Sequence, residues 1–214
     1  MSALLAKLFS FSRYGEFSRC LWWRCVLPAQ IRRKGVQLGK AVNFHGKPII
    51  SKFEGSQIVL GDRCSFCSSS EYTALGVNHP VILRTLASHA HLSIGPDTGI
   101  SGATICAARK VTIGANVLIG ANVVICDTDF HPIRPEGRRY NSNPQEISVS
   151  PVVIEDNVFI GTGAMVLKGV HIGKNSVIGA GSIVTKSIPE NVVAAGNPAK
   201  VIETLTLREA KAGG

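Results

Sequence analysis

Aliphatic residues return at every sixth position along much of this 214-residue chain, a period that few folds can accommodate. A period of six fits neither an amphipathic α-helix nor a single alternating strand. It predicts a very short strand followed by a turn, repeated, with one aliphatic side chain directed inward each time. The pattern is complete over Ile154, Ile160, Val166, Ile172, Ile178 and Val184, recurs at Ile94, Ile100, Ile113, Ile119 and Ile125, and begins weakly at Leu38 and Leu60.

Three such units close a triangular coil, and stacked coils satisfy each other's backbone groups at the usual strand spacing of about 4.8 Å. Glycine often follows the inward residue, as at Gly161, Gly173 and Gly179, where a turn leaves little room for a side chain. Small residues such as Ala164 and Ser176 come four positions after it, which suits a narrow interior. We therefore expect an all-β fold made of stacked coils.

The composition agrees with a packed aliphatic core. Hydrophobic residues make up 45% of the chain and charged residues 17%, which excludes an intrinsically disordered protein. Aromatic residues are only 6%, so aliphatic side chains must fill the interior. The longest uncharged apolar stretch, 111–126, is too short to span a bilayer and contains Gly114 and Gly120, which argues against a polytopic membrane protein.

The repeats resemble those of a known family. The runs IGANVLIGANVVI and VFIGTGAMVLKGVHIGKNSVIGAGSIVTKSIP, followed by AAGNPAKVI, are similar to hexapeptide acyltransferases. The resemblance implies a left-handed parallel β-helix over residues 36–203 and a homotrimer with active sites between subunits. Residues 1–35 then form a basic, aromatic N-terminal segment, and residues 204–214 form a short tail.

The repeat is interrupted twice. Ile94 and Ile113 are nineteen positions apart, one coil plus one residue, which predicts a small bulge. The larger interruption, 126–151, is polar, contains four prolines and three arginines, and cannot continue the aliphatic face. Such an insertion in a solenoid leaves the coil on one face, often the binding face. It contains His131, and histidine is the usual side chain for taking a proton near neutral pH.

The run ICDTDFHPI resembles the catalytic loop of the sugar and xenobiotic O-acetyltransferases of that family. The resemblance implies that His131 is the general base, which activates an acceptor hydroxyl for direct attack on acetyl-CoA without a covalent enzyme intermediate. Asp127 or Asp129 could hold the other ring nitrogen, or both could be solvated loop carboxylates. Ser101 is the nearest candidate for acceptor binding, where sugar-acetylating relatives often have asparagine.

The C-terminal repeats resemble the coenzyme A-contacting segments of the family. The resemblance implies that the pantetheine groove and the phosphates of acetyl-CoA are contacted by Gly161, Thr162, Ala180, Thr185, Lys186, Pro198 and Lys200. Any one of them could instead only turn a corner of the coil. Whether the acyl group is acetyl or longer is open.

The sequence gives little support for a metal site. Cys64 and Cys67 form a CxxC pair, but no second pair or suitably spaced histidines complete four ligands. His89 and His91 form an HxH without a further partner, and His171 fits a solvated surface position. We therefore expect no metal, and small buried cysteines in a reducing compartment.

The N-terminal segment is strongly basic. Residues 1–34 hold seven Lys and Arg against a single acidic residue, Glu16, together with Trp22, Trp23 and several Phe and Leu. This mixture suits peripheral association with an anionic membrane surface. It also suits a helix that packs in the trimer or covers the open first coil, and Pro28 should end that helix. No motif beyond charge points to nucleic acid.

Two functions follow from these patterns. The first is an acetyl-CoA-dependent O-acetyltransferase acting on a sugar, a cell-surface polysaccharide or a small hydroxylated compound. It would be cytoplasmic, at the inner membrane surface if the N-terminal segment binds there. The second is a non-catalytic or metal-binding β-helical trimer that serves as a scaffold.

Overall fold

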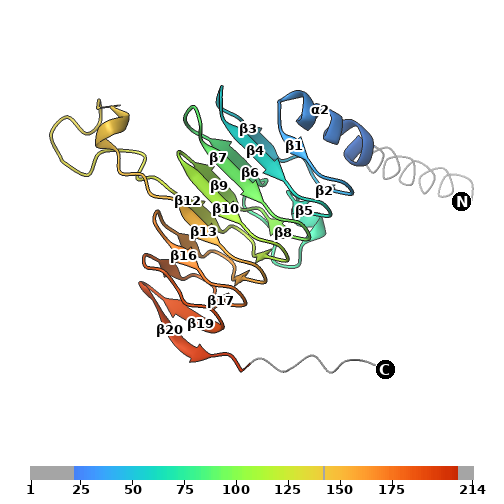
Figure 1. The fold of residues 1–214 in the computed structure, drawn as a ribbon. Helices are drawn as coiled ribbons and strands as arrows, with labels where there is room; N and C mark the ends of the chain where they lie inside the picture. The colour runs from blue at the N-terminus through green and yellow to red at the C-terminus, as the bar shows by residue number, and fades with distance from the viewer. Residues whose placement is uncertain (1–21, 142, 207–214) are drawn as a thin grey trace, which may run out of the picture.

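The computed structural model describes residues 22–141 and 143–206, which form a three-sided coil of stacked parallel strands (Figure 1). Each turn of the coil gives one short strand to each of three sheets. Neighbouring coils are in register, so that Ile113 pairs with Ile154 and Ile119 pairs with Ile160. The predicted all-β coil of six-residue units is confirmed.

The three sheets are named A, B and C in the order in which the chain visits them. Sheet A contains β1 (Gln37–Leu38), β4 (Gln57–Leu60), β7 (His91–Ile94), β10 (Lys110–Ile113), β13 (Val152–Ile154) and β16 (His171–Ile172). Sheet B contains β2 (Asn43–His45), β5 (Ser65–Cys67), β8 (Gly99–Ser101), β11 (Leu118–Ile119), β14 (Phe159–Ile160), β17 (Val177–Ile178), β19 (Val192–Gly196) and β20 (Ala199–Thr204). Sheet C contains β3 (Ile49–Ser51), β6 (Ile82–Thr85), β9 (Thr104–Ala107), β12 (Val124–Cys126), β15 (Met165–Val166) and β18 (Ile183–Val184).

Columns of aliphatic side chains fill the interior. Ile94, Ile113, Ile154 and Ile172 from sheet A are almost fully buried, like their counterparts from the other two sheets. At the edge between sheets A and B, the third residue of each turn has a left-handed backbone with φ between 53° and 61°. Asparagine tolerates this conformation better than most residues. The side chains of three such asparagines form a ladder: Asn157 Nδ2 donates to Asn175 Oδ1, and Asn175 Nδ2 donates to Asn191 Oδ1.

The first coil is covered by the described part of the N-terminal segment. A π-helical turn, η1 (Trp22–Val26), continues into α2 (Leu27–Arg33), whose Leu27 and Ile31 are buried in the core. Basic side chains of this region bind the coil: Arg32 donates to the carbonyl oxygens of Leu38 and Gly39, and Lys34 to that of Ile50. For these residues the covering interpretation is confirmed.

The expectation that Pro28 ends the helix is wrong. Pro28 lies in the first turn of α2, where its missing N–H costs no helical hydrogen bond. The residues before it wind as η1 instead of continuing an α-helix. The membrane interpretation concerned residues 1–34, of which 1–21 lie outside the described residues.

At the other end, β20 closes the coil by pairing antiparallel with β19. This hairpin is the one antiparallel strand pair among the three described sheets, and it covers the last parallel edge with an exposed strand. The first coil is thus covered by a helix at the top, and sheet B ends in a hairpin at the bottom.

Two segments leave the coil. The large excursion, 127–151, projects from the body between β12 and β13 and contains the short 3-10 helix η3 (Pro144–Glu146), as Figure 1 shows. The small excursion, 68–81, follows β5 and contains η2 (Ser70–Tyr72). The sequence analysis did not predict the small excursion, because the repeat is weak in this region. No helix within 22–141 and 143–206 has the length and apolar character needed to cross a membrane.

Candidate functional site

The large excursion leaves and rejoins the coil as a narrow antiparallel stalk. Thr128 bridges to Val149, the Asp129 N–H donates to the Ser148 carbonyl, and the Ser150 N–H donates to that of Asp127. The stalk stands at the edge between sheets C and A, because β12 belongs to sheet C and β13 to sheet A. Residues 128–131 are therefore held at a fixed place on the coil surface.

Asp127 ties the base of the excursion to the coil above it. Its fully buried carboxylate accepts the N–H groups of Ala108, Arg109 and Lys110 at 2.6–2.7 Å. These residues form the turn between β9 and β10, which accommodates the extra length between Ile94 and Ile113. Both oxygens are thus occupied by backbone donors. This corrects the expectation that Asp127 could orient the His131 ring.

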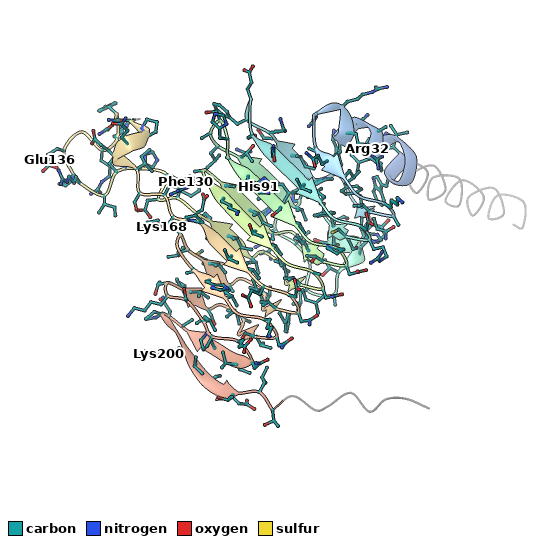
Figure 2. All side chains as sticks on the ribbon, in the orientation of Figure 1. Arg32, His91, Phe130, Glu136, Lys168 and Lys200 are labelled. Carbon is teal, nitrogen blue, oxygen red and sulfur yellow. The ribbon has the colours of Figure 1, made fainter. Side chains whose placement is uncertain are left out.

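Asp129 is bound on the opposite side, to the coil below. Its Oδ1 pairs with Lys168 Nζ at 2.8 Å, and the two side chains are 26% and 27% exposed. Its Oδ2 is buried and has no hydrogen-bond partner among the described residues. Lys168 follows β15 and lies beneath the excursion (Figure 2). Lys168 was not predicted from the sequence, because a lysine in a repeat turn carries no signal of its own.

His131 is exposed at the end of the stalk. Its N–H donates to the Asp129 carbonyl at 2.7 Å, which makes a tight turn across Phe130, whose φ is 62°. The next residue, Pro132, is buried, and with Ile133, Arg134, Gln145, Glu146 and Ser148 it lines a hollow of about 400 Å³ inside the excursion. The histidine is thus accessible to a bound molecule while the backbone on both sides of it is fixed.

A groove of about 510 Å³ runs along the edge between sheets B and C. It contains four of the predicted site residues, Ser101, Gly161, Thr162 and Ala180. Its floor includes Gly161, where a Cβ would lie 2.5 Å from the Ala180 nitrogen. The remaining walls come from Thr73–Leu75 of the small excursion, from Gly120 and Ala121, and from Phe159 and 177–179.

The other predicted residues lie elsewhere. Thr185 and Lys186 are exposed just after β18, on the same edge as Lys168 and the large excursion. Pro198 and Lys200 are exposed in the β19–β20 hairpin, and Figure 2 shows Lys200 at the opposite end of the coil from Arg32. Within one chain, the structure therefore gathers Ser101 with three predicted cofactor residues but leaves His131 on a different edge.

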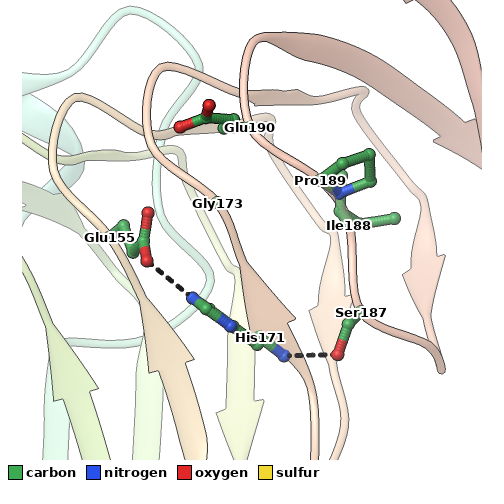
Figure 3. A pocket seen from close by; sticks show the side chains of 7 residues that line it. All are labelled: Glu155, His171, Gly173, Ser187, Ile188, Pro189 and Glu190. Atoms are coloured by element: carbon green, nitrogen blue, oxygen red, sulfur yellow. Dashed lines mark hydrogen bonds and ion pairs between the residues drawn. The ribbon is translucent and has the colours of Figure 1, made fainter.

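A second histidine lies in a polar hollow on sheet A (Figure 3). His171 Nε2 is 2.8 Å from Glu155 Oε1, and the Lys174 N–H donates to the other oxygen of Glu155. The hydrogen bond from the Lys174 N–H has the larger effect and the contact with His171 the smaller. Both hold the pKa of the Glu155 carboxyl below its usual value. Ser187 Oγ accepts the backbone N–H of His171 instead of bonding to its ring, so this group is not a catalytic triad. The predicted surface position of His171 is confirmed.

Four cysteines, Cys64, Cys67, Cys106 and Cys126, are buried free thiols. Burial raises the pKa of the Cys64, Cys106 and Cys126 thiols, which keeps them protonated at neutral pH and makes them poor nucleophiles. Within 22–141 and 143–206, no group of three or more His, Cys, Asp or Glu side chains is arranged to hold a metal ion.

The sequence of this chain is similar to those of known proteins. Residues 110–127 and 151–186 match the model of the hexapeptide repeat of succinyl-transferase. The chain is 49% identical over 169 residues to the galactoside O-acetyltransferase of Escherichia coli K12, covering 78% of this chain and 80% of that enzyme. It is 50% identical to the enzyme of the same name from Lactococcus lactis, but over only 42% of each chain.

Solved structures agree. A galactoside acetyltransferase in complex with coenzyme A superimposes with a TM-score of 0.50 and 31% identity, covering 79% of this chain and 65% of that one. A maltose O-acetyltransferase from Clostridium difficile 630 superimposes with a TM-score of 0.50 and 29% identity, covering 80% and 70%. The coil is accordingly the expected left-handed parallel β-helix. The chain belongs to the hexapeptide-repeat acyltransferase family, and within it is similar to the galactoside and maltose O-acetyltransferases.

Proposed function

We propose that this protein transfers an acetyl group from acetyl-CoA to a hydroxyl group of a sugar or a sugar-containing acceptor. The observation that carries the proposal is the similarity to a galactoside O-acetyltransferase over 80% of that enzyme's length. An exposed histidine on a fixed stalk and a groove lined by glycine and small residues supply the two parts that the reaction needs.

His131 serves as the general base in this proposal. It takes the proton of the acceptor hydroxyl, and the oxygen attacks the thioester carbonyl of acetyl-CoA in a ternary complex. The new C–O bond forms, the C–S bond breaks, and the proton passes from the histidine to the leaving sulfur. The cysteines take no part, since the described thiols among them are buried and His131 needs no covalent intermediate.

The groove is the proposed donor site. Gly161, Thr162 and Ala180 offer a narrow, largely apolar surface on which a pantetheine chain can lie. We assign the phosphate contacts to the exposed cations Lys186 and Lys200, with Thr185 and Pro198 beside them. Thr185 and Lys186 lie on the edge that carries His131, so in this proposal a neighbouring subunit supplies them. Ser101, at the upper end of the same groove, is the proposed contact for the acceptor.

The working unit that we propose is a homotrimer. His131 and the groove lie on different edges of one chain, so a site that contains both takes them from neighbouring subunits. The outer face of sheet C supplies an apolar surface for this contact, since one outward column holds Ile49, Ile82, Thr104, Val124, Met165 and Ile183. The matching column on sheet A is mostly polar, with Gln37, Val59, Ser93, Thr112, Val153 and His171.

The test is acceptor-dependent release of free thiol from acetyl-CoA across a panel of galactosides, maltose, other sugars and hydroxylated antibiotics. His131→Ala is expected to lower kcat at least about 100-fold, as loss of a general base does. His171→Ala is the matched control, because it removes an exposed histidine on the outer face of sheet A that pairs with Glu155, and it should leave turnover unchanged.

Equal turnover in wild type and His131→Ala would refute the assigned base. Absence of both thiol release and measurable binding of coenzyme A would favour the non-catalytic scaffold. Cell-surface polysaccharide as the acceptor and the cytoplasmic face of the membrane as the location stay predictions. The location depends on the N-terminal segment, of which residues 1–21 lie outside the described residues.

A further inference from the structure

Asp129 joins three parts of the molecule at the base of the large excursion. Its N–H donates to Ser148 on the returning arm of the stalk, and its carbonyl accepts the N–H of His131. Its carboxylate reaches out of the excursion to Lys168 on the next coil. The backbone position of His131 therefore depends on where Asp129 is held.

Lys168 is the charge that holds Asp129. The pair lies 2.8 Å apart with about a quarter of each side chain exposed, so solvent screens it less than an open surface pair. The second carboxylate oxygen is buried and has no hydrogen-bond partner within the described residues. Without Lys168, a partly buried negative charge would keep no counter-charge on this side, and Asp129 would move toward water.

The turn that presents His131 also needs support from outside. The bond from the His131 N–H back to the Asp129 carbonyl spans one residue, and Phe130 between them has a φ of 62°. A non-glycine residue in such a turn is strained and persists only where its surroundings hold it. Phe130 itself is 47% exposed and supplies little packing. The contacts of Asp129 on both sides therefore fix the turn.

We propose that Lys168 is a positioning residue for His131, acting through Asp129. This inference rests on the proposed role of His131 as general base. The Lys168 ammonium is paired with Asp129, whereas the proposed donor contacts belong to the groove and to Lys186. Loss of Lys168 should therefore impair the chemical step and leave donor binding unchanged.

The first test compares kcat with the KM for acetyl-CoA in three variants. Lys168→Met is expected to lower kcat about 10- to 100-fold with the KM unchanged, the effect of a base displaced by about 1 Å. Lys168→Arg keeps the charge and should restore most of the activity. Lys174→Met removes a lysine of another ion pair, with Glu190, and should match wild type. A Lys168→Met kcat equal to that of Lys174→Met, or no recovery in Lys168→Arg, would overturn the proposal.

A double-mutant cycle tests whether Lys168 acts through Asp129. Asp129→Asn alone should lower kcat about as much as Lys168→Met, and the double variant should be little worse than either single one. Independent, multiplying losses would show that Lys168 acts by another route.

Amide hydrogen exchange separates failure of this inference from failure of the proposed function. In Lys168→Met, the amides of Asp129 and His131 should exchange faster than in wild type and Lys174→Met, whether or not an acceptor is known. Wild type with neither thiol release nor binding of coenzyme A would refute the transferase, while unchanged exchange in Lys168→Met would refute the positioning role.

Discussion

Asp127 and Asp129 are separated by one residue, yet their carboxylates are bound on opposite sides of the excursion. Asp127 accepts three N–H groups from the turn above it, and Asp129 pairs with a lysine from the coil below. The chain bends at Asp127, which breaks the strand alternation that would place residues two positions apart on the same face. The two carboxylates thus have separate roles. Together they anchor the short stretch 127–129 that connects the coil to His131.

Replacement of Asp127 tests its anchoring role. Asp127→Ala leaves three backbone N–H groups without their acceptor and should lower the free energy of unfolding by about 3 kcal/mol. Asp127→Asn keeps one acceptor oxygen and should lose about half as much. Urea-induced unfolding followed by circular dichroism measures both values. An unfolding free energy equal to wild type in Asp127→Ala would show that water replaces the carboxylate without cost.

Glycine residues in the turns allow adjacent coils to stack closely. At Gly95, which follows β7, a Cβ would lie 2.5 Å from the backbone of Gly114 in the next coil. At Gly99, which begins β8 in the same coil, a Cβ would lie 3.6 Å from the Leu118 side chain, an ordinary contact. The two glycines differ only in where they stand relative to the neighbouring coil.

These two positions predict opposite outcomes for the same substitution. Gly95→Ala forces adjacent coils apart and should cost about 3 kcal/mol of unfolding free energy, at the upper end for overpacking. Gly99→Ala should change stability by less than about 0.5 kcal/mol, because the methyl group has room and the unfolded chain loses freedom. Thermal and urea unfolding of the pair decide the matter, and equal losses would contradict the stacking account.

Across the whole molecule, the outer faces of sheets A and C differ in character. Sheet C carries the apolar column described above, in which Ile49 and Met165 are each 42% exposed in the isolated chain. Sheet A carries polar and charged side chains that suit contact with water. This difference supports sheet C as the contact face of the proposed trimer, since a column of exposed apolar side chains is stabilised by burial against another subunit.

A charge on each face tests the assembly. Met165→Glu should dissociate the trimer, because it buries a carboxylate without a partner in the subunit contact. Val153→Glu makes a comparable change on sheet A and should leave the trimer intact. Light scattering after size-exclusion chromatography gives the mass of each variant. Dissociation by Val153→Glu alone would place the contact on sheet A, and monomeric wild type would rule out the trimer.

The fold was predictable from sequence because the repeat is a local and redundant signal. Each aliphatic residue of the repeat from Ile113 to Val184 indicates one inward position. Because the repeat occurs many times, a single irregular position does not obscure it. The place where the chain leaves the coil was predictable for the same reason, since the polar segment 126–151 cannot supply an inward residue. The small excursion at 68–81 was missed, because the repeat around it is too weak to show an interruption.

The sequence by itself determined the coil, the large excursion and, through a family resemblance, His131 as the candidate base. Only the tertiary structure decided what the residues around it do. The partners of Asp127 lie 17 to 19 positions before it and the partner of Asp129 lies 39 positions after it. Stacking of coils brings these groups together, and no local pattern encodes which turn lies above or below a given carboxylate. The repeat is a local property of the sequence, whereas contacts between coils form only in the folded protein.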